Sequence, residues 1–158
     1  MKNIKLVILG EILLLVVAFL FTIFVCGGNI AWYLDIPSII LILVILIPGL
    51  IIMGAWKDFI KAFSVGTKHY SLLELKNILG AVSTAQKLVV LGALFTLIIS
   101  GIVVLGGVSG ASDASLIGPN LAVCFLSAFY AVIIEMLLLP LHLNAEREMN
   151  REMDFEDE

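Results

Sequence analysis

Two carboxylates lie inside segments that are otherwise apolar. Glu135 stands near the centre of the run YAVIIEMLLLPLHL, residues 130–143, and Glu11 interrupts the run at residues 6–26. An acid at membrane depth needs a charged partner, a proton or a water-filled surface, because hydrocarbon does not solvate it. Both acids are therefore candidate functional groups, and the helices that hold them decide where they lie.

Small and hydroxyl side chains recur on one face of each of two apolar segments. In the earlier segment they come every fourth residue, at Gly92, Thr96 and Ser100. In the later one they follow a spacing of four, three, four and four residues, at Asn120, Cys124, Ser127, Ala131 and Glu135. Such a stripe either lets two helices pack closely within one subunit or lines a polar pore. Spacing alone favours the packing seam, and both interpretations stay open.

The sequence carries no pattern that is typical of an enzyme. It has no glycine-rich phosphate loop, and His69 and His142 stand apart from any cluster at metal-ligand spacing. His142 is predicted to lie at the membrane interface. We predict no catalytic residue, no metal, no cofactor and no nucleic-acid partner.

Composition indicates an integral membrane protein. The 158 residues are 61% hydrophobic and 14% charged, with a mean hydropathy of +1.16, against about 45–50% and about 25% in soluble domains. A helix needs about 20 apolar residues to cross a lipid bilayer. Four runs meet this length, at residues 6–26, 36–56, 88–108 and 116–143. We predict an all-α polytopic protein whose four spans form a single membrane domain over residues 1–158.

All nine Lys and Arg residues fall on one side of this topology. They precede the first span, lie between the second and third, or follow the fourth: Lys2, Lys5, Lys57, Lys61, Lys68, Lys76, Lys87, Arg147 and Arg151. The loops at 27–35 and 109–115 hold none. By the positive-inside rule, both termini and the segment at 57–87 are predicted to be cytoplasmic. The first span is interpreted as retained, because its run is too long for a signal peptide and no A-x-A site follows.

The segment between the second and third spans has helical signals. Ser71 and Glu74 form a capping-box pattern, and apolar residues at helical spacing follow without a Gly-Pro break. We predict one helix over 72–108, whose first turns project into the cytoplasm, and a turn at 66–69. Residues 57–63 are predicted to extend the second span in the same way.

The chain ends in an acidic stretch, and its two cysteines lie in or beside apolar runs. Residues 144–158 are predicted to be a solvated cytoplasmic tail, with an interaction segment as the less favoured alternative. The sequence has only two cysteines, Cys26 and Cys124, and both lie in apolar surroundings, so we predict no disulfide framework. Both are predicted to be packed, reduced thiols.

Three motifs resemble the MotA family. GGNIAWYLDIPSIILIL, residues 27–43, has a Gly-Gly after the first span and a short loop ending in Asp-x-Pro-Ser before the second. IGPNLAVCFLSAFYAVIIEMLLLPL, residues 117–141, is similar to the last span of the family, from its Ile-Gly-Pro opening to its Pro-Leu near the exit. LVVLGALFTLIISGIVVLGG, residues 88–107, resembles the third span more loosely. In this order and topology, the chain resembles the wider MotA/TolQ/ExbB proton-channel group over residues 27–107 and 117–143, outside most of the cytoplasmic segment.

The resemblance implies a homopentamer in a bacterial inner membrane, whose third and fourth spans line a central pore. A dimer of a single-span MotB-like or ExbD-like partner would pass through the pore and supply the ion-binding aspartate. Passage of H+ or Na+ would turn the ring around that partner, as in a motor stator. The resemblance favours the pore-lining interpretation of the two stripes. The residues then predicted to line the pore are Thr96, Ser100, Asn120, Ser127, Ala131 and Glu135. Ser127 and Ala128 match the family's hydroxyl-rich pair with one hydroxyl lost, Pro140 matches its exit proline, and Gly92 is assigned a structural role.

The chain departs from the family pattern in three places. The large cytoplasmic insertion that engages a flagellar rotor is reduced to residues 57–87. Residues 84–91 lack the proline that begins the third span, and the fourth span is one residue short between Tyr130 and Pro140. The alternative hypothesis is therefore a membrane scaffold of the same fold without ion conduction.

Orientation places Glu135 and Glu11 at similar depth, in the inner third of the membrane. Glu135 then has three interpretations: it borders a cytoplasmic ion exit, it pairs within or between subunits, or it reaches to the headgroups. The partners considered for pairing are Glu11, Lys57 and Lys87. The resemblance places the main ion carrier on the partner chain.

Overall fold

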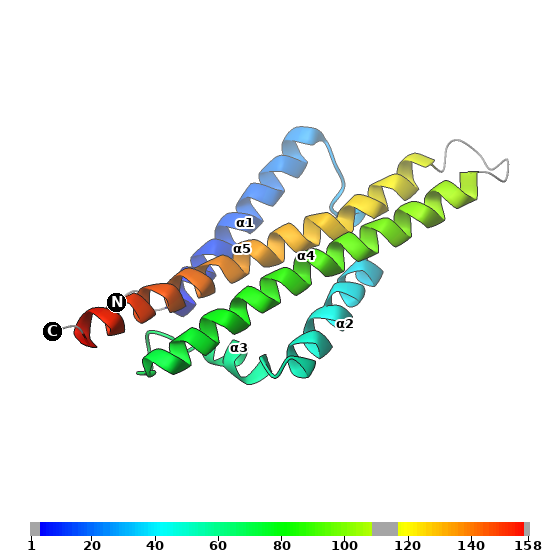
Figure 1. Ribbon diagram of the computed structural model, residues 1–158. Helices are drawn as coiled ribbons and strands as arrows, with labels where there is room; N and C mark the ends of the chain where they lie inside the picture. Colours follow the sequence, from blue (N-terminus) through cyan, green and yellow to red (C-terminus); the bar gives the residue numbers. More distant parts are fainter. Residues whose placement is uncertain (1–3, 109–116, 157–158) are drawn as a thin grey trace.

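The computed structural model describes residues 4–108 and 117–156, most of which are helical (Figure 1). In chain order the elements are α1 (Ile4–Cys26), the 3-10 helix η1 (Ile30–Tyr33), α2 (Ile36–Ile52), α3 (Trp56–Ala62), α4 (Leu72–Val108) and α5 (Ile117–Glu156). Four of the helical segments are long and apolar enough to cross a membrane, which agrees with the predicted four-span, multi-pass architecture. The loop predicted at 109–115 lies outside the described residues.

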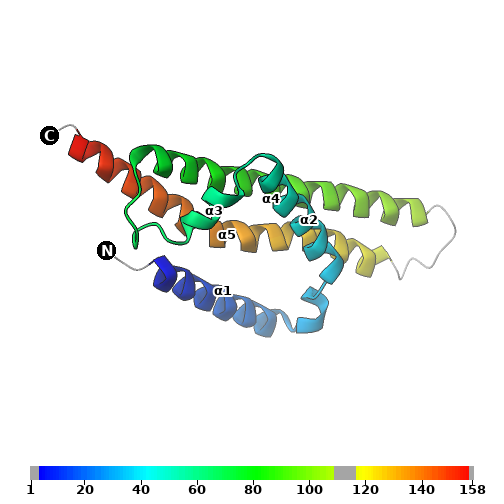
Figure 2. The same ribbon diagram turned by 90° about the horizontal axis from the view of Figure 1, so that it is seen from below.

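Helices α4 and α5 form the centre of the molecule. They run antiparallel and make the most extensive contact between any two elements. Helix α2 packs mainly on α4, and α1 lies along α5 on the side away from α4 (Figure 2). Both termini lie at one end, together with α3 and the turn before α4 (Figure 1). We call this the basic end, because α3 and the turn carry Lys57, Lys61 and Lys68, and we call the opposite end the distal end.

The first turn of α4 confirms the predicted capping box. Ser71 N donates to Glu74 Oε2 at 3.2 Å, and Glu74 N donates to Ser71 Oγ at 3.4 Å, so each residue satisfies a backbone amide of the helix start. Lys61 of α3 lies 3.0 Å from Asp58 and 3.6 Å from Glu74. Its hydrogen bond to Asp58 holds the pKa of the Lys61 ammonium above its usual value. The single helix predicted over 72–108 is confirmed, as is the turn before it.

Helix α2 ends at Ile52, so the predicted span 36–56 is four residues too long. Gly54 has a φ of 68°, and the amide of the next residue donates to the carbonyl five residues earlier at 2.9 Å. This is a Schellman ending, which needs a residue that tolerates a left-handed backbone. The prediction that 57–63 extends the second span is therefore wrong, and α3 is a separate helix. The signal was present, because a glycine directly follows the apolar run.

Helix α5 continues through most of the stretch 144–158 that was predicted to be a solvated tail. The first turns of that stretch pack against the rest of the chain. Ala145 is fully buried, and Asn144 Nδ2 donates to Val65 O at 3.0 Å in the turn before α4. The prediction is corrected here, because Ala145 and Met149 continue the buried face of α5 beyond the charged residues that dominate the sequence.

Apolar side chains have different surroundings in the two halves of the α4–α5 pair. At the basic end they form the buried core, which includes Phe59, Ala62, Val65, Leu75, Ile78, Val82, Leu138, Leu141 and Ala145. In the distal half of α4 they point outwards, as at Leu91, Leu94, Phe95, Ile98, Ile102, Val103 and Leu105. Outward apolar side chains on a helix suit contact with lipid. Most large apolar residues of α1 are also exposed.

Candidate functional site

The predicted stripe on α4 faces other parts of the same chain. A Cβ atom added at Gly92 would lie 3.5 Å from Ile45 of α2, which shows how closely these two helices approach. Thr96 is 2% exposed, and its hydroxyl donates to Gly92 O at 2.9 Å. Ser100 is half-buried. A threonine bonded to the preceding turn of its own helix needs no water or second helix to satisfy its hydroxyl.

The stripe on α5 is buried in the same way. Ser127 is 0% exposed, and its hydroxyl donates to Cys124 O at 3.0 Å. Cys124 and Ala131 are also buried, whereas Cys26 is exposed, and the structure shows no disulfide between the two cysteines. The side chain of Asn120 lies outside the described residues. Burial within one chain is what the packing-seam interpretation predicts, and pore lining stays a prediction.

Glu135 lies at the basic side of this seam and faces α4. It is half-buried, and the side chain of Gln86 interacts with its carboxyl through a hydrogen bond. From this contact, Thr96 lies ten residues along α4 and Ser127 eight residues back along α5, or ~15 Å and ~12 Å of helix. The two hydroxyls therefore lie at similar heights, and the seam connects them with the acid. Sequence reasoning missed Gln86, because it stands just before the predicted third span.

The second oxygen of Glu135 is less well satisfied. Oε1 is buried and has no hydrogen-bond partner among the described residues. Within the described residues, Glu135 forms no ion pair with Lys57 or Lys87, whose side chains are exposed. The same residues show no hydrogen bond between Glu135 and Glu11. Pairing of these groups between subunits stays a prediction. Because a buried oxygen is costly to leave without a partner, Glu135 is the residue of this seam that most needs an explanation.

A second buried polar atom follows on the same helix. His142 is half-buried, and its Nδ1 is buried without a hydrogen-bond partner among the described residues. Its interfacial position stays a prediction. Pro140 lies between the two groups, inside α5. Proline has no amide proton for the carbonyl four residues earlier, here that of Met136. Glu135, Pro140 and His142 therefore fall close together on α5. The sequence singled out the acid and the proline, but it did not indicate that His142 belongs with them.

Tyr130 joins α5 to the connection between α1 and α2. Its hydroxyl accepts from Asp35 N at 2.7 Å and donates to Tyr33 O, and its ring lies beside Phe129. The Asp35 carboxylate accepts a hydrogen bond from Ser38 in the first turn of α2. Tyr130 is thirteen residues into α5, ~20 Å from its distal start. The α1–α2 connection is therefore held against the middle of α5, and the distal parts of α4 and α5 extend beyond it (Figures 1 and 2).

Tyr130→Phe is expected to loosen this connection without unfolding the chain. The substitution keeps the ring but removes one acceptor and one donor, so the amide of Asp35 loses its partner. Amide hydrogen exchange over residues 33–35 should accelerate by about tenfold, the equivalent of one hydrogen bond of roughly 1–1.5 kcal/mol. Tyr70→Phe, which removes a hydroxyl 2.8 Å from Ser64 Oγ at the basic end, is the matched control and should leave residues 33–35 unchanged. Equal exchange in the two variants would contradict the role of the Tyr130 hydroxyl.

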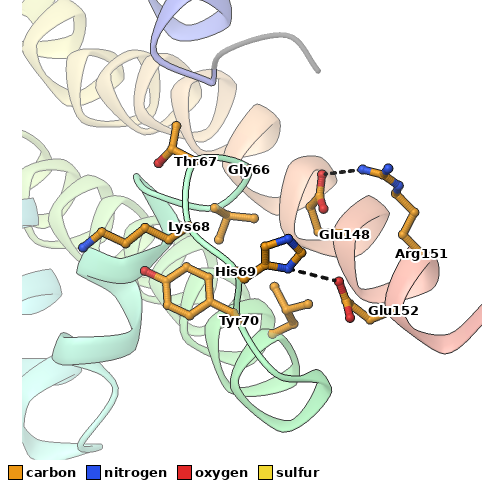
Figure 3. Close-up of a pocket in the computed structure, with 10 residues that line it drawn as sticks. Gly66, Thr67, Lys68, His69, Tyr70, Glu148, Arg151 and Glu152 are labelled. Carbon is orange, nitrogen blue, oxygen red and sulfur yellow. Dashed lines mark ion pairs between the residues drawn. The ribbon is translucent and has the colours of Figure 1, made fainter. Parts of the chain in front are cut away.

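A cavity of about 310 Å³ opens at the basic end between the turn before α4 and the last part of α5 (Figure 3). Charged side chains line much of it. Arg151 lies 3.6 Å from Glu148, and His69 Nδ1 lies 3.7 Å from Glu152. The cavity therefore holds acceptors and donors of protons in contact with solvent. In the described parts of the chain, no group of three or more His, Cys, Asp or Glu side chains is arranged to hold a metal ion.

Comparison of the chain with protein-family models, with curated proteins and with solved structures finds no match. The sequence motifs and the geometry of the α4–α5 seam are therefore the features that bear on function.

Proposed function

We propose that this chain is the channel-forming subunit of an ion-driven complex in a bacterial inner membrane, of the MotA/TolQ/ExbB kind. The proposal is supported by the motifs that resemble this group, by four helices suited to crossing a membrane, and by the placement of the basic residues on one side. With the basic end in the cytoplasm, both termini and α3 lie inside the cell. Five copies would surround a dimer of a single-span partner that carries the ion-binding aspartate.

The main support for the proposal is the environment of the Glu135 carboxyl. Its carboxyl lies in the seam between α4 and α5, below the Thr96 and Ser127 hydroxyls, and one of its oxygens is buried without a hydrogen-bond partner in the part of the chain that the structure describes. If Glu135 had only a structural role, both of its carboxylate oxygens would be expected to accept hydrogen bonds. An acid that receives and releases an ion as part of its function can have one carboxylate oxygen without a protein hydrogen bond. On this proposal, Glu135 accepts H+ or Na+ after it leaves the aspartate of the partner chain and passes it towards the cytoplasm.

A membrane scaffold without conduction is the second candidate function. It is favoured by the burial of Thr96 and Ser127, whose hydroxyls are already satisfied by carbonyls of their own helices. On this alternative, the seam only holds α4 and α5 together. The two candidates share the same fold and differ in whether ions cross.

Flux measurement on reconstituted complexes separates the two candidates. The chain is purified with a single-span candidate partner that carries a membrane-embedded aspartate, and the complex is placed in vesicles that contain a pH-sensitive or a sodium-sensitive dye. A five-to-two assembly by native mass measurement, with ion uptake that disappears when the aspartate of the partner is changed to Asn, is the expected result. A strictly monomeric or dimeric chain would contradict the proposal. An intact assembly without flux would favour the scaffold.

A further inference from the structure

Two side-chain atoms are buried without a protein hydrogen-bond partner among the described residues, and both lie on α5. They are Oε1 of Glu135 and Nδ1 of His142. Buried polar atoms in folded proteins are bonded in the great majority of cases, and each exception calls for a ligand, a water molecule or a reactive role. Two exceptions on one helix call for a common explanation.

The two residues share one face of the helix. They are seven residues apart, which is two turns, or ~10 Å along the axis. In the other direction, the same face continues one turn from Glu135 to Ala131 and then to Ser127 of the seam. Leu138, which is 5% exposed, separates the two polar groups. Side chains alone therefore do not connect Glu135 with His142, and water would have to bridge them past Leu138.

The helix offers a further acceptor in this interval. Pro140 cannot donate to the carbonyl of Met136, so one backbone oxygen between the two side chains has lost its usual helical donor. Beyond His142, the first α5 residue that lines the cavity at the basic end is Glu148, six residues or ~9 Å further on. Polar atoms are thus spaced from the seam to a solvent-exposed, charged cavity.

We infer that Glu135 and His142 line a water-filled proton path along α5, in which His142 takes the proton from Glu135 and passes it to the cavity at the basic end. The inference rests on the proposed function and deepens it by naming H+ as the ion. An imidazole can accept and release a proton, but it has no comparable role in moving Na+. In each passage, the Glu135 carboxyl gives its proton to water and the water chain protonates Nδ1 of the neutral ring. The imidazolium then releases the proton on its other nitrogen to water on the cavity side. A rotation of the ring then turns the free nitrogen back towards Glu135, so that the next proton enters on that nitrogen and leaves from the other. The two nitrogens thus alternate as acceptor, protons balance, and no redox partner is needed.

Chemical rescue tests this path in vesicles that contain the chain and its single-span partner. His142→Ala should lower proton uptake by about tenfold or more, and added imidazole should restore much of it. Pyrazole has nearly the same shape but is a far weaker base, and should restore little. Rescue by imidazole alone supports the inference, because a role in packing would be rescued by both molecules. Unchanged proton uptake in His142→Ala, or equal rescue by the two molecules, overturns it.

A second measurement does not depend on flux. In the wild-type chain labelled with 15N-histidine in lipid nanodiscs, magnetisation transfer from water should reach the His142 ring. His69, whose side chain is fully exposed, is the positive control. A dry His142 ring beside a wet His69 overturns the inference whatever the flux. A wet His142 ring in a complex that carries no protons supports the hydrated path and contradicts the proposed function, so the two failures are distinguishable.

Discussion

Leu141→Ala is expected to destabilise the folded chain by about 2–5 kcal/mol, the usual cost of removing a large side chain from a packed core. Leu141 is 1% exposed and belongs to the core at the basic end, with Val82 of α4 among its members. The substitution leaves a cavity between elements that are far apart in the sequence, and the surrounding helices can close it only in part.

The matched control is Leu139→Ala, two residues earlier on the same helix. Leu139 is 48% exposed, so its truncation removes little contact within the chain and should cost less than about 1 kcal/mol. Unfolding of the two variants is followed by circular dichroism in a detergent that keeps the chain monomeric. Equal losses of unfolding free energy in the two variants would contradict the observed burial of Leu141. They would mean that both faces of α5 contact lipid or detergent at residues 139–141.

Glu135→Gln is expected to reduce ion flux by about a hundredfold or more while leaving the assembly intact. Glutamine has nearly the same shape and can still bond to Gln86, but it has no proton to release and no charge to hold a cation. The measurement is dye-reported uptake in vesicles that contain the chain and its single-span partner, together with native mass of the assembly.

Glu11→Gln is the matched control for this result. Glu11 is an acid predicted to lie at comparable depth in α1, a helix that packs on α5 and takes no part in the α4–α5 seam. Its substitution should leave flux within about twofold of wild type, because a side chain outside the path contributes little to transfer of the ion. Loss of the assembly in Glu135→Gln would instead support pairing between subunits, and full flux in that variant would remove Glu135 from the path.

The helices themselves follow from local physics and could be predicted. Apolar length identified the four spans, and Ser71 with Glu74 fixed the start of α4, because a capping box involves only neighbouring residues. The end of α2 was missed although it is also local. Gly54 was read as part of an apolar run, whereas its left-handed conformation stops the helix. Spacing also identified correctly that Gly92 and Thr96 share one face.

The tertiary structure decided what each face contacts. Lipid and protein cores both accept apolar side chains, so the sequence alone could not distinguish the buried Leu141 from the exposed Leu139. Nor could it show that Ser127 is covered by its own chain, that Gln86 reaches Glu135, or that Nδ1 of His142 is buried. These features depend on the register of α4 against α5, which is set by contacts between residues far apart in the sequence. The sequence by itself determined the helices and the candidate acid, and only their packing determined which residues lie beside that acid.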